Sequence, residues 1–189
     1  MVTRRQSLLA LLAGSAAAQA QSPAQSQSPA VPAEVAAELP GARLQGQGRL
    51  RFLGLRVYDA RLWVGTTPVD RQGADWAPVP LALEMQYARR LGGVKIAESS
   101  LSEMQRQGEI EAAKGARWLS AMTSVFPEVK EGDRISGLNV PGVGARFFVN
   151  GQLKGDVRDP EFARLFFGIW LSTKTSEPSL RDALLGKVP

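Results

Sequence analysis

The order of hydrophobic patterns along this chain predicts an α+β fold, in which helices cover one face of an antiparallel β-sheet. Apolar residues alternate with a period of two, as expected of strands, in residues 46–64, 80–88 and 134–157. They repeat every three or four residues, as expected of helices, in residues 96–126 and 160–186. Strands and helices therefore come in separate blocks along the chain, which is typical of the α+β class.

Residues 1–20 have the features of an export signal. Arg4 and Arg5 supply positive charge, Leu8–Ala18 form a short apolar run, and Ala18-Gln19-Ala20 is a small-x-small cleavage signature. The arginine pair also resembles the twin-arginine motif, so the general secretion route and the twin-arginine route are both open. The apolar run is shorter than the ~20 residues that a membrane span needs. We therefore expect a periplasmic or secreted protein with no stable membrane anchor after cleavage.

Residues 21–38 are rich in Gln, Ser, Pro and Ala and contain few large apolar side chains. Such a composition does not bury enough apolar surface to fold by itself, so we expect a disordered linker here. The folded domain is predicted to comprise residues 39–189, which is long enough to enclose one hydrophobic core.

The composition excludes several classes of function. The 189 residues contain no Cys and no His, which excludes disulfides, thiol nucleophiles, imidazole metal ligands and Ser-His-Asp triads. Neither a cofactor nor a metal ion is expected. The formal charge of +5 is spread along the chain without a basic patch, so we expect no nucleic-acid partner. Nothing in the sequence indicates an oligomeric state.

Residues 46–64 form the first predicted hairpin, with a bend at Gly54. Strand alternation assigns its side chains to two faces. One face receives Arg49, Arg51, Leu53, Leu55 and Val57. The other receives Leu50, Phe52, Gly54, Arg56 and Tyr58. The hairpin could thus hold an anion beside an apolar body, and the alternative is a sheet whose polar face is simply solvated.

Local signals place the remaining elements. Residues 80–88 are predicted to form a third strand that carries Tyr87 on its more apolar face. Asn150-Gly151 is the strongest turn signal, because both residues accept a positive φ in a two-residue hairpin. Asp159-Pro160-Glu161 has the residue types preferred at a helix start, and the helix that follows is apolar on more than one side. A short helix is expected at the end of the chain.

Five segments together resemble the bacterial chalcone isomerase-like proteins. They are GQGRLRFLGLRVYDARLWV, IAESSLSEM, FPEVKEGDRISG, FFVNGQLKG and DPEFARLFFGIWL. No single segment is diagnostic, but their order and spacing are specific, and the resemblance extends from about residue 44 to the C-terminus. It implies the chalcone isomerase fold, an antiparallel sheet with helices layered over it and a ligand cleft between them.

The family includes plant isomerases, which close a chalcone into a flavanone, and plastid relatives that bind fatty acids. In both, the resemblance implies that an arginine in a Gly-x-Gly-x-Arg stretch meets the anionic part of the ligand. Here that position is Leu50, after Gly46 and Gly48, and Leu53 stands where the plant enzymes have a threonine five residues before the Val-Tyr pair. Both departures argue against chalcone cyclisation. Either a register shift at the glycines restores an arginine to the site, or the anion site is absent.

The first functional hypothesis is a protein that binds a small apolar or amphipathic anionic ligand, fatty-acid-like or aromatic. Arg49 or Arg51 with Tyr58 would hold a carboxylate or phenolate, since a charge-assisted hydrogen bond contributes roughly 1.5–3 kcal/mol. Arg56 and Tyr58 are the alternative pair, because alternation places both on one face. Burial of the apolar part of the ligand would supply the remaining affinity.

Two further hypotheses stay open. An intramolecular lyase of the chalcone isomerase type would need a donor for the developing enolate, and Tyr58 or Tyr87 could serve. A non-catalytic envelope partner would have a filled cleft and an exposed apolar patch around Phe166, Phe167 and Trp170. An open apolar cavity with an arginine at its mouth would favour binding, and converging hydroxyl donors would favour catalysis.

Overall fold

The computed structural model describes residues 29–70 and 75–187. The predicted export signal, residues 1–20, and the first part of the predicted linker, residues 21–28, lie outside the described residues. The described residues form six β-strands and five α-helices.

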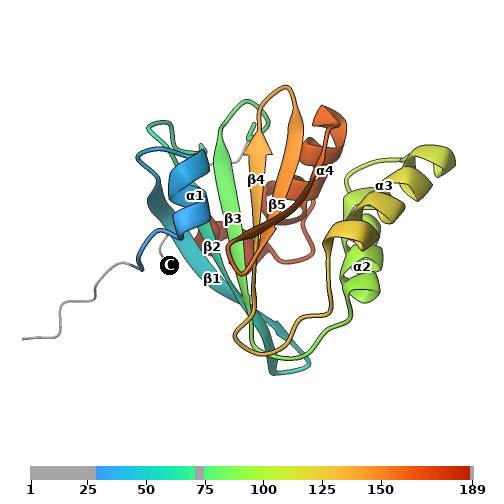
Figure 1. Ribbon diagram of the computed structural model, residues 1–189, viewed down its shortest axis with the longest axis horizontal. Helices are drawn as coiled ribbons and strands as arrows, with labels where there is room; N and C mark the ends of the chain where they lie inside the picture. The colour runs from blue at the N-terminus through green and yellow to red at the C-terminus, as the bar shows by residue number, and fades with distance from the viewer. Residues whose placement is uncertain (1–28, 71–74, 188–189) are drawn as a thin grey trace, which may run out of the picture.

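A single antiparallel sheet forms the centre of the fold (Figure 1). Its strands are β1 (Arg43–Phe52), β2 (Leu55–Val64), β3 (Leu81–Tyr87), β4 (Arg134–Val140), β5 (Gly144–Val149) and β6 (Gln152–Val157). They lie in the sheet in the order β1-β2-β3-β4-β5-β6, so each strand pairs with its neighbours in sequence. Every pairing is antiparallel, which confirms the predicted α+β class.

Helices pack on both faces of this sheet. They are α1 (Ala33–Glu38), α2 (Gly93–Gln105), α3 (Ala112–Val125), α4 (Pro160–Leu171) and α5 (Pro178–Leu184). Leu62 and Trp63 are adjacent on β2 and point to opposite faces. Leu62 belongs to the main core, which α2 to α5 also enter, whereas Trp63 packs with Val35 of α1. Helices α2 to α5 thus cover one face of the sheet, as predicted, and α1 packs on the other face, which was not predicted.

The main core is aromatic at its centre. Phe166 of α4 packs edge-to-face on Phe147 of β5, with ring centroids 5.1 Å apart. Phe162, one helical turn earlier, stacks on Phe166 at 5.5 Å. Phe166 and Phe167 are fully buried and Trp170 is 6% exposed. The exposed patch that would favour the partner hypothesis therefore does not form at these residues.

The prediction of a disordered linker is wrong for residues 33–38. Helix α1 forms there, and its Val35 is fully buried. The Glu34 carboxylate accepts hydrogen bonds from Arg134 Nη2 and from Ser136 Oγ, each at 2.9 Å. Arg134 lies 100 residues further along the chain, so local composition does not reveal this partner.

Two glycines of β1 allow helix α5 to pack directly on the strand. A Cβ atom on Gly46 would lie 2.2 Å from the carbonyl oxygen of Ala183 and 2.3 Å from that of Leu184. A Cβ atom on Gly48 would lie 2.6 Å from Leu180 Cδ1. The Gly-x-Gly part of the family motif therefore has a packing role in this chain.

Two hairpin turns have nearly the same pair of positive φ angles. At Asn150-Gly151, between β5 and β6, φ is 49° and 82°, which confirms the predicted turn. At Leu53-Gly54, between β1 and β2, φ is 49° and 79°. The second turn thus places a leucine in the left-handed region, which Asn and Gly adopt more easily.

Candidate ligand-binding site

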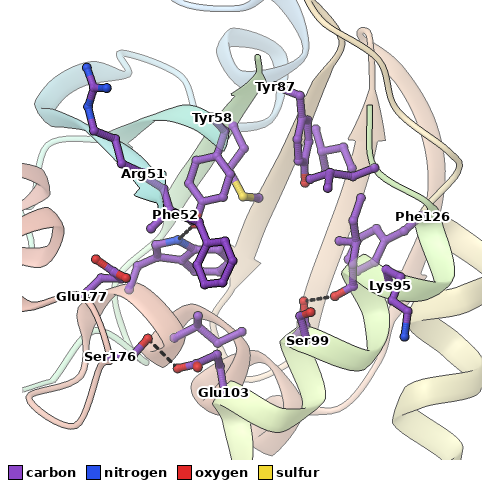
Figure 2. Close-up of a pocket in the computed structure, with 18 residues that line it drawn as sticks. Arg51, Phe52, Tyr58, Tyr87, Lys95, Ser99, Glu103, Phe126, Ser176 and Glu177 are labelled. Carbon is purple, nitrogen blue, oxygen red and sulfur yellow. Dashed lines mark hydrogen bonds between the residues drawn. The ribbon is translucent and has the colours of Figure 1, made fainter. Parts of the chain in front are cut away.

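A pocket of about 500 Å³ opens between the β1–β2 hairpin and helix α2 (Figure 2). It is lined by Leu50, Arg51, Phe52, Tyr58, Met85, Tyr87, Leu91, Lys95, Ile96, Ser99, Ser100, Glu103, Phe126, Ile135, Ile169, Trp170, Ser176 and Glu177. Its volume is typical of small-molecule sites, which range over roughly 300–1,000 Å³. The cleft between sheet and helices is therefore open rather than filled, which counts against the partner hypothesis.

Apolar side chains make up most of the pocket wall. Leu50, Met85 and Ile135 line it from the sheet, and Ile96 and Ile169 line it from α2 and α4. Contact with such a wall stabilises a bound apolar group by about 25 cal/mol for each Å² removed from water. The pocket is thus suited to an apolar body.

Tyr58 of β2 is one of the polar groups inside this wall. Its hydroxyl accepts a hydrogen bond from Trp170 Nε1 at 2.9 Å, and its ring meets Tyr87 edge-on, with centroids 5.9 Å apart. Burial raises the pKa of Tyr58 above its ordinary value of 10.0, so the hydroxyl keeps its proton at neutral pH. The proton of this hydroxyl remains available for donation to a ligand.

Tyr87 of β3 lies directly opposite Tyr58 in the sheet. The residue is 3% exposed, and Figure 2 shows its hydroxyl pointing into the pocket. Burial raises the pKa of Tyr87, so it is an uncharged donor. The Tyr87 hydroxyl has no hydrogen-bond partner among the described residues. A bound acceptor would satisfy this group.

The structure places Arg49 and Arg56 outside this pocket. Arg49 Nε lies 2.7 Å from Oδ1 of Asp59, and Arg56 contacts Oδ2 of the same carboxylate. Partial burial alone would raise the pKa of Asp59, but hydrogen bonds from both arginines hold it below its ordinary value. Asp59 therefore already engages both guanidinium groups.

The prediction that Arg56 and Tyr58 share a face is wrong. The register between β1 and β2 shifts after Leu50, which pairs with Tyr58, whereas Arg51 pairs with Arg56. Val57 is therefore an extra residue in β2, a β-bulge, and it turns Arg56 away from Tyr58. The two residues do not form the alternative anion-binding pair.

Arg51 is the arginine that lies at the rim of the pocket. Its Nη1 donates to the backbone oxygen of Gly54 at 3.2 Å, and Figure 2 shows the guanidinium directed away from the two tyrosines. Leu50, at the position of the family's arginine, lines the pocket. Leu53 lies in the turn with 86% of its surface exposed and does not line the pocket. The strand pairing also shifts register between Leu44 and Gly46, but this shift does not place Arg49 in the pocket.

Sequence reasoning missed the polar residues that α2 and the segment after α4 bring to the pocket mouth. They are Lys95, Ser99, Ser100, Glu103, Ser176 and Glu177. Lys95 Nζ pairs with Glu98 at 2.8 Å, and Ser176 donates to Glu103 at 2.9 Å. The helical spacing of the α2 residues indicates that some of them share one face of a helix, but it does not indicate which face meets the sheet.

The part of the chain that the structure describes shows neither a metal site nor a membrane-spanning helix. No group of three or more Asp, Glu, His or Cys side chains there is placed to hold a metal ion. No helix among these residues is long and apolar enough to cross a membrane. Inside its apolar wall, the pocket offers hydrogen-bond donation from the hydroxyls of Tyr58 and Tyr87.

Comparison with known proteins identifies the family. The sequence profile of the family described as chalcone isomerase-like matches residues 27–186. The chain belongs to the chalcone isomerase-like family. This confirms the family that the five sequence segments indicated, and the matched range includes helix α1 of this chalcone isomerase-like chain.

The crystal structure of a fatty-acid binding protein from Arabidopsis thaliana shares the fold. It matches this chalcone isomerase-like protein with a TM-score of 0.62 over 78% of this chain and 88% of that chain. The two sequences are 15% identical, so the likeness establishes the fold alone. No curated protein sequence matches this chain. The family, the fold and the open pocket together support ligand binding.

Proposed function

We propose that this protein is exported and binds a small apolar or amphipathic anionic ligand, fatty-acid-like or aromatic, in the pocket beside α2. The observation that carries the proposal is the open, mainly apolar pocket with two protonated tyrosine hydroxyls inside it. Burial of the apolar body supplies most of the affinity, and the hydroxyls fix orientation. The Arabidopsis thaliana protein of the same fold, named for fatty-acid binding, supports this ligand class.

The anionic end of such a ligand is expected at the pocket mouth beside Arg51. A carboxylate buried away from any cation carries a large desolvation cost. Within the described residues Arg51 has no carboxylate partner, whereas Lys95 at the mouth is paired with Glu98. The ligand would thus enter with its apolar end first. Tyr87 would then donate to a hydroxyl, keto or phenolic oxygen on the apolar body.

The Arg51→Gln variant is expected to weaken oleate binding about tenfold, because a charge-assisted hydrogen bond at a solvent-exposed rim is lost. Isothermal titration calorimetry on purified protein measures the affinity. Mass spectrometry of a denaturing extract first identifies any ligand that co-purifies and must be removed.

The Arg56→Gln variant is the matched control for this measurement. It removes the same charge from the same hairpin, but Arg56 does not line the pocket. Its oleate affinity is expected to equal that of the wild type. Equal losses in the two variants would indicate a general charge effect. A wild-type protein that binds neither oleate nor aromatic acids would contradict the proposed function.

Export is a separate part of the proposal and rests on residues 1–20. Cell fractionation of a bacterium that expresses the full chain is expected to recover the protein from the periplasm. Conversion of both Arg4 and Arg5 to lysine would block the twin-arginine route but leave general secretion intact. Wild-type protein that stays in the cytoplasm would rule out export.

An intramolecular lyase is the second candidate, and one observation favours it. The hydroxyls of Tyr58 and Tyr87 lie in one pocket as protonated donors, as stabilisation of an enolate requires. A chalcone cyclisation assay distinguishes the candidates. A rate equal to that in buffer supports binding alone, whereas a faster rate that the Tyr87→Phe variant loses would support the enzyme.

A further inference from the structure

The end of the β1–β2 hairpin exposes a cluster of apolar side chains, which we call the hairpin tip (residues 52–55). Phe52, Leu53 and Leu55 expose 65%, 86% and 56% of their surfaces. They account for half of the large apolar residues that are exposed in the described part of the chain. Figure 1 shows this hairpin extending past the ends of the neighbouring strands. The hairpin tip is thus a local apolar projection rather than scattered surface.

Leu53 is unfavourable in two ways: its backbone is strained in the turn, and its apolar side chain is exposed to water. Its φ of 49° lies in the left-handed region, where a leucine side chain is strained. The β5–β6 hairpin repeats this geometry with Asn150-Gly151, the residues that the turn prefers. The leucine therefore neither relieves backbone strain nor buries apolar surface within the monomer. Contact with an apolar surface outside the chain would explain its presence.

The hairpin end also carries positive charge. Residues 49–59 contain three arginines and one aspartate. Asp59 is shared between Arg49 and Arg56, and Arg51 has no carboxylate partner within the described residues. Apolar side chains flanked by arginines fit the surface of an anionic bilayer. The apolar groups reach the acyl chains while the guanidinium groups meet lipid phosphates.

A second copy of this chain fits the hairpin tip less well. A stable protein interface buries about 800 Å² on each partner, which four residues do not supply. Self-association through the tip would also bring arginines of like charge together. A bilayer surface needs only a few inserted side chains and supplies the opposite charge.

We propose that the hairpin tip docks on the surface of anionic lipid bilayers. Phe52 belongs both to the hairpin tip and to the pocket lining, so docking would place the pocket mouth at the lipid surface. An apolar ligand would then pass between bilayer and pocket without exposure to bulk water. Docking goes beyond the proposed function and does not depend on the identity of the ligand.

Co-sedimentation with vesicles of phosphatidylglycerol and phosphatidylcholine in equal parts tests this proposal. The wild-type protein is expected to bind these vesicles at low salt and to be released as salt is raised. Binding to pure phosphatidylcholine vesicles is expected to be about tenfold weaker. The double variant Leu53→Asn/Leu55→Ser is expected to bind the anionic vesicles about tenfold more weakly than the wild type. Asparagine suits the turn geometry, so this variant is expected to fold.

The matched control is Leu153→Ser. Leu153 has the same 56% exposure as Leu55 but lies on β6, at the other edge of the sheet. The wild type and every variant begin at the same residue, Gln21, after the predicted cleavage site, so any contribution of residues 21–28 is common to all. Equal binding by the wild type and the double variant would overturn the proposal. So would light scattering that shows the wild type to be an oligomer and the double variant a monomer.

Oleate titration without vesicles separates this proposal from the proposed function. Leu53 and Leu55 do not line the pocket, so the double variant is expected to bind oleate as the wild type does. Vesicle binding by a wild-type protein that binds neither oleate nor aromatic acids would contradict the proposed function alone. Oleate binding without vesicle binding would contradict docking alone.

Discussion

The Ser99→Trp variant is expected to lose measurable oleate binding while it keeps its stability. Ser99 is an exposed residue of α2 that lines the pocket mouth, so an indole there would occupy space that the ligand needs. Because the site is solvent-exposed, the larger side chain does not overpack the core, and the unfolding midpoint is expected to stay close to that of the wild type. Calorimetric titration and urea unfolding measure the two quantities.

The Ser102→Trp variant is the matched control. Ser102 is exposed on the same helix but does not line the pocket. We expect it to bind oleate with wild-type affinity. A loss of binding in both variants would point to a disturbed helix, and full binding by Ser99→Trp would place the ligand elsewhere.

The Gly46→Val variant is expected to lower the free energy of unfolding by about 3 kcal/mol. A Cβ atom at Gly46 would lie 2.2 Å from the carbonyl oxygen of Ala183, so β1 and α5 would have to separate. That separation would expose Leu180 and Leu184, which α5 contributes to the main core. Urea unfolding followed by circular dichroism measures the change.

The Gly108→Val variant controls for the general cost of replacing a glycine. A Cβ atom at Gly108 meets no atom within 4 Å, so its cost is expected to stay within about 0.5 kcal/mol. An unfolding midpoint for Gly46→Val equal to that of the wild type would contradict the packing of α5 on β1.

Helix starts and turns that depend on residues close together in the sequence were predictable from the sequence. The Asp159 side chain accepts hydrogen bonds from backbone N–H groups in the first turn of α4, as its residue type indicated. Asn150-Gly151 likewise forms its turn. Helix α1 was not predictable in this way, because six residues are too few to be stable alone. It depends on distant partners such as Arg134.

The candidate site was predictable only in part. Tyr58, Tyr87 and Arg51 were named from the sequence and line the pocket. Arg49 and Arg56 do not line the pocket, although the alternating pattern made them candidates for the site as much as Arg51. Alternation assigns faces only while strand pairing is regular, and a single extra residue reverses the assignment beyond it. A bulge of this kind leaves no mark in the hydrophobic pattern.

The pairing of β3 with β4 joins two parts of the chain that α2 and α3 separate in sequence. The pocket takes Met85 from one side of this junction and Ile135 from the other. A ligand that binds only the assembled pocket therefore raises the free energy of unfolding by RT ln(1 + [L]/Kd). Ligand-bound protein would therefore unfold, and be cleaved by proteases, less often than ligand-free protein. The supply of ligand would thus help to set how long each copy of the protein survives in the cell.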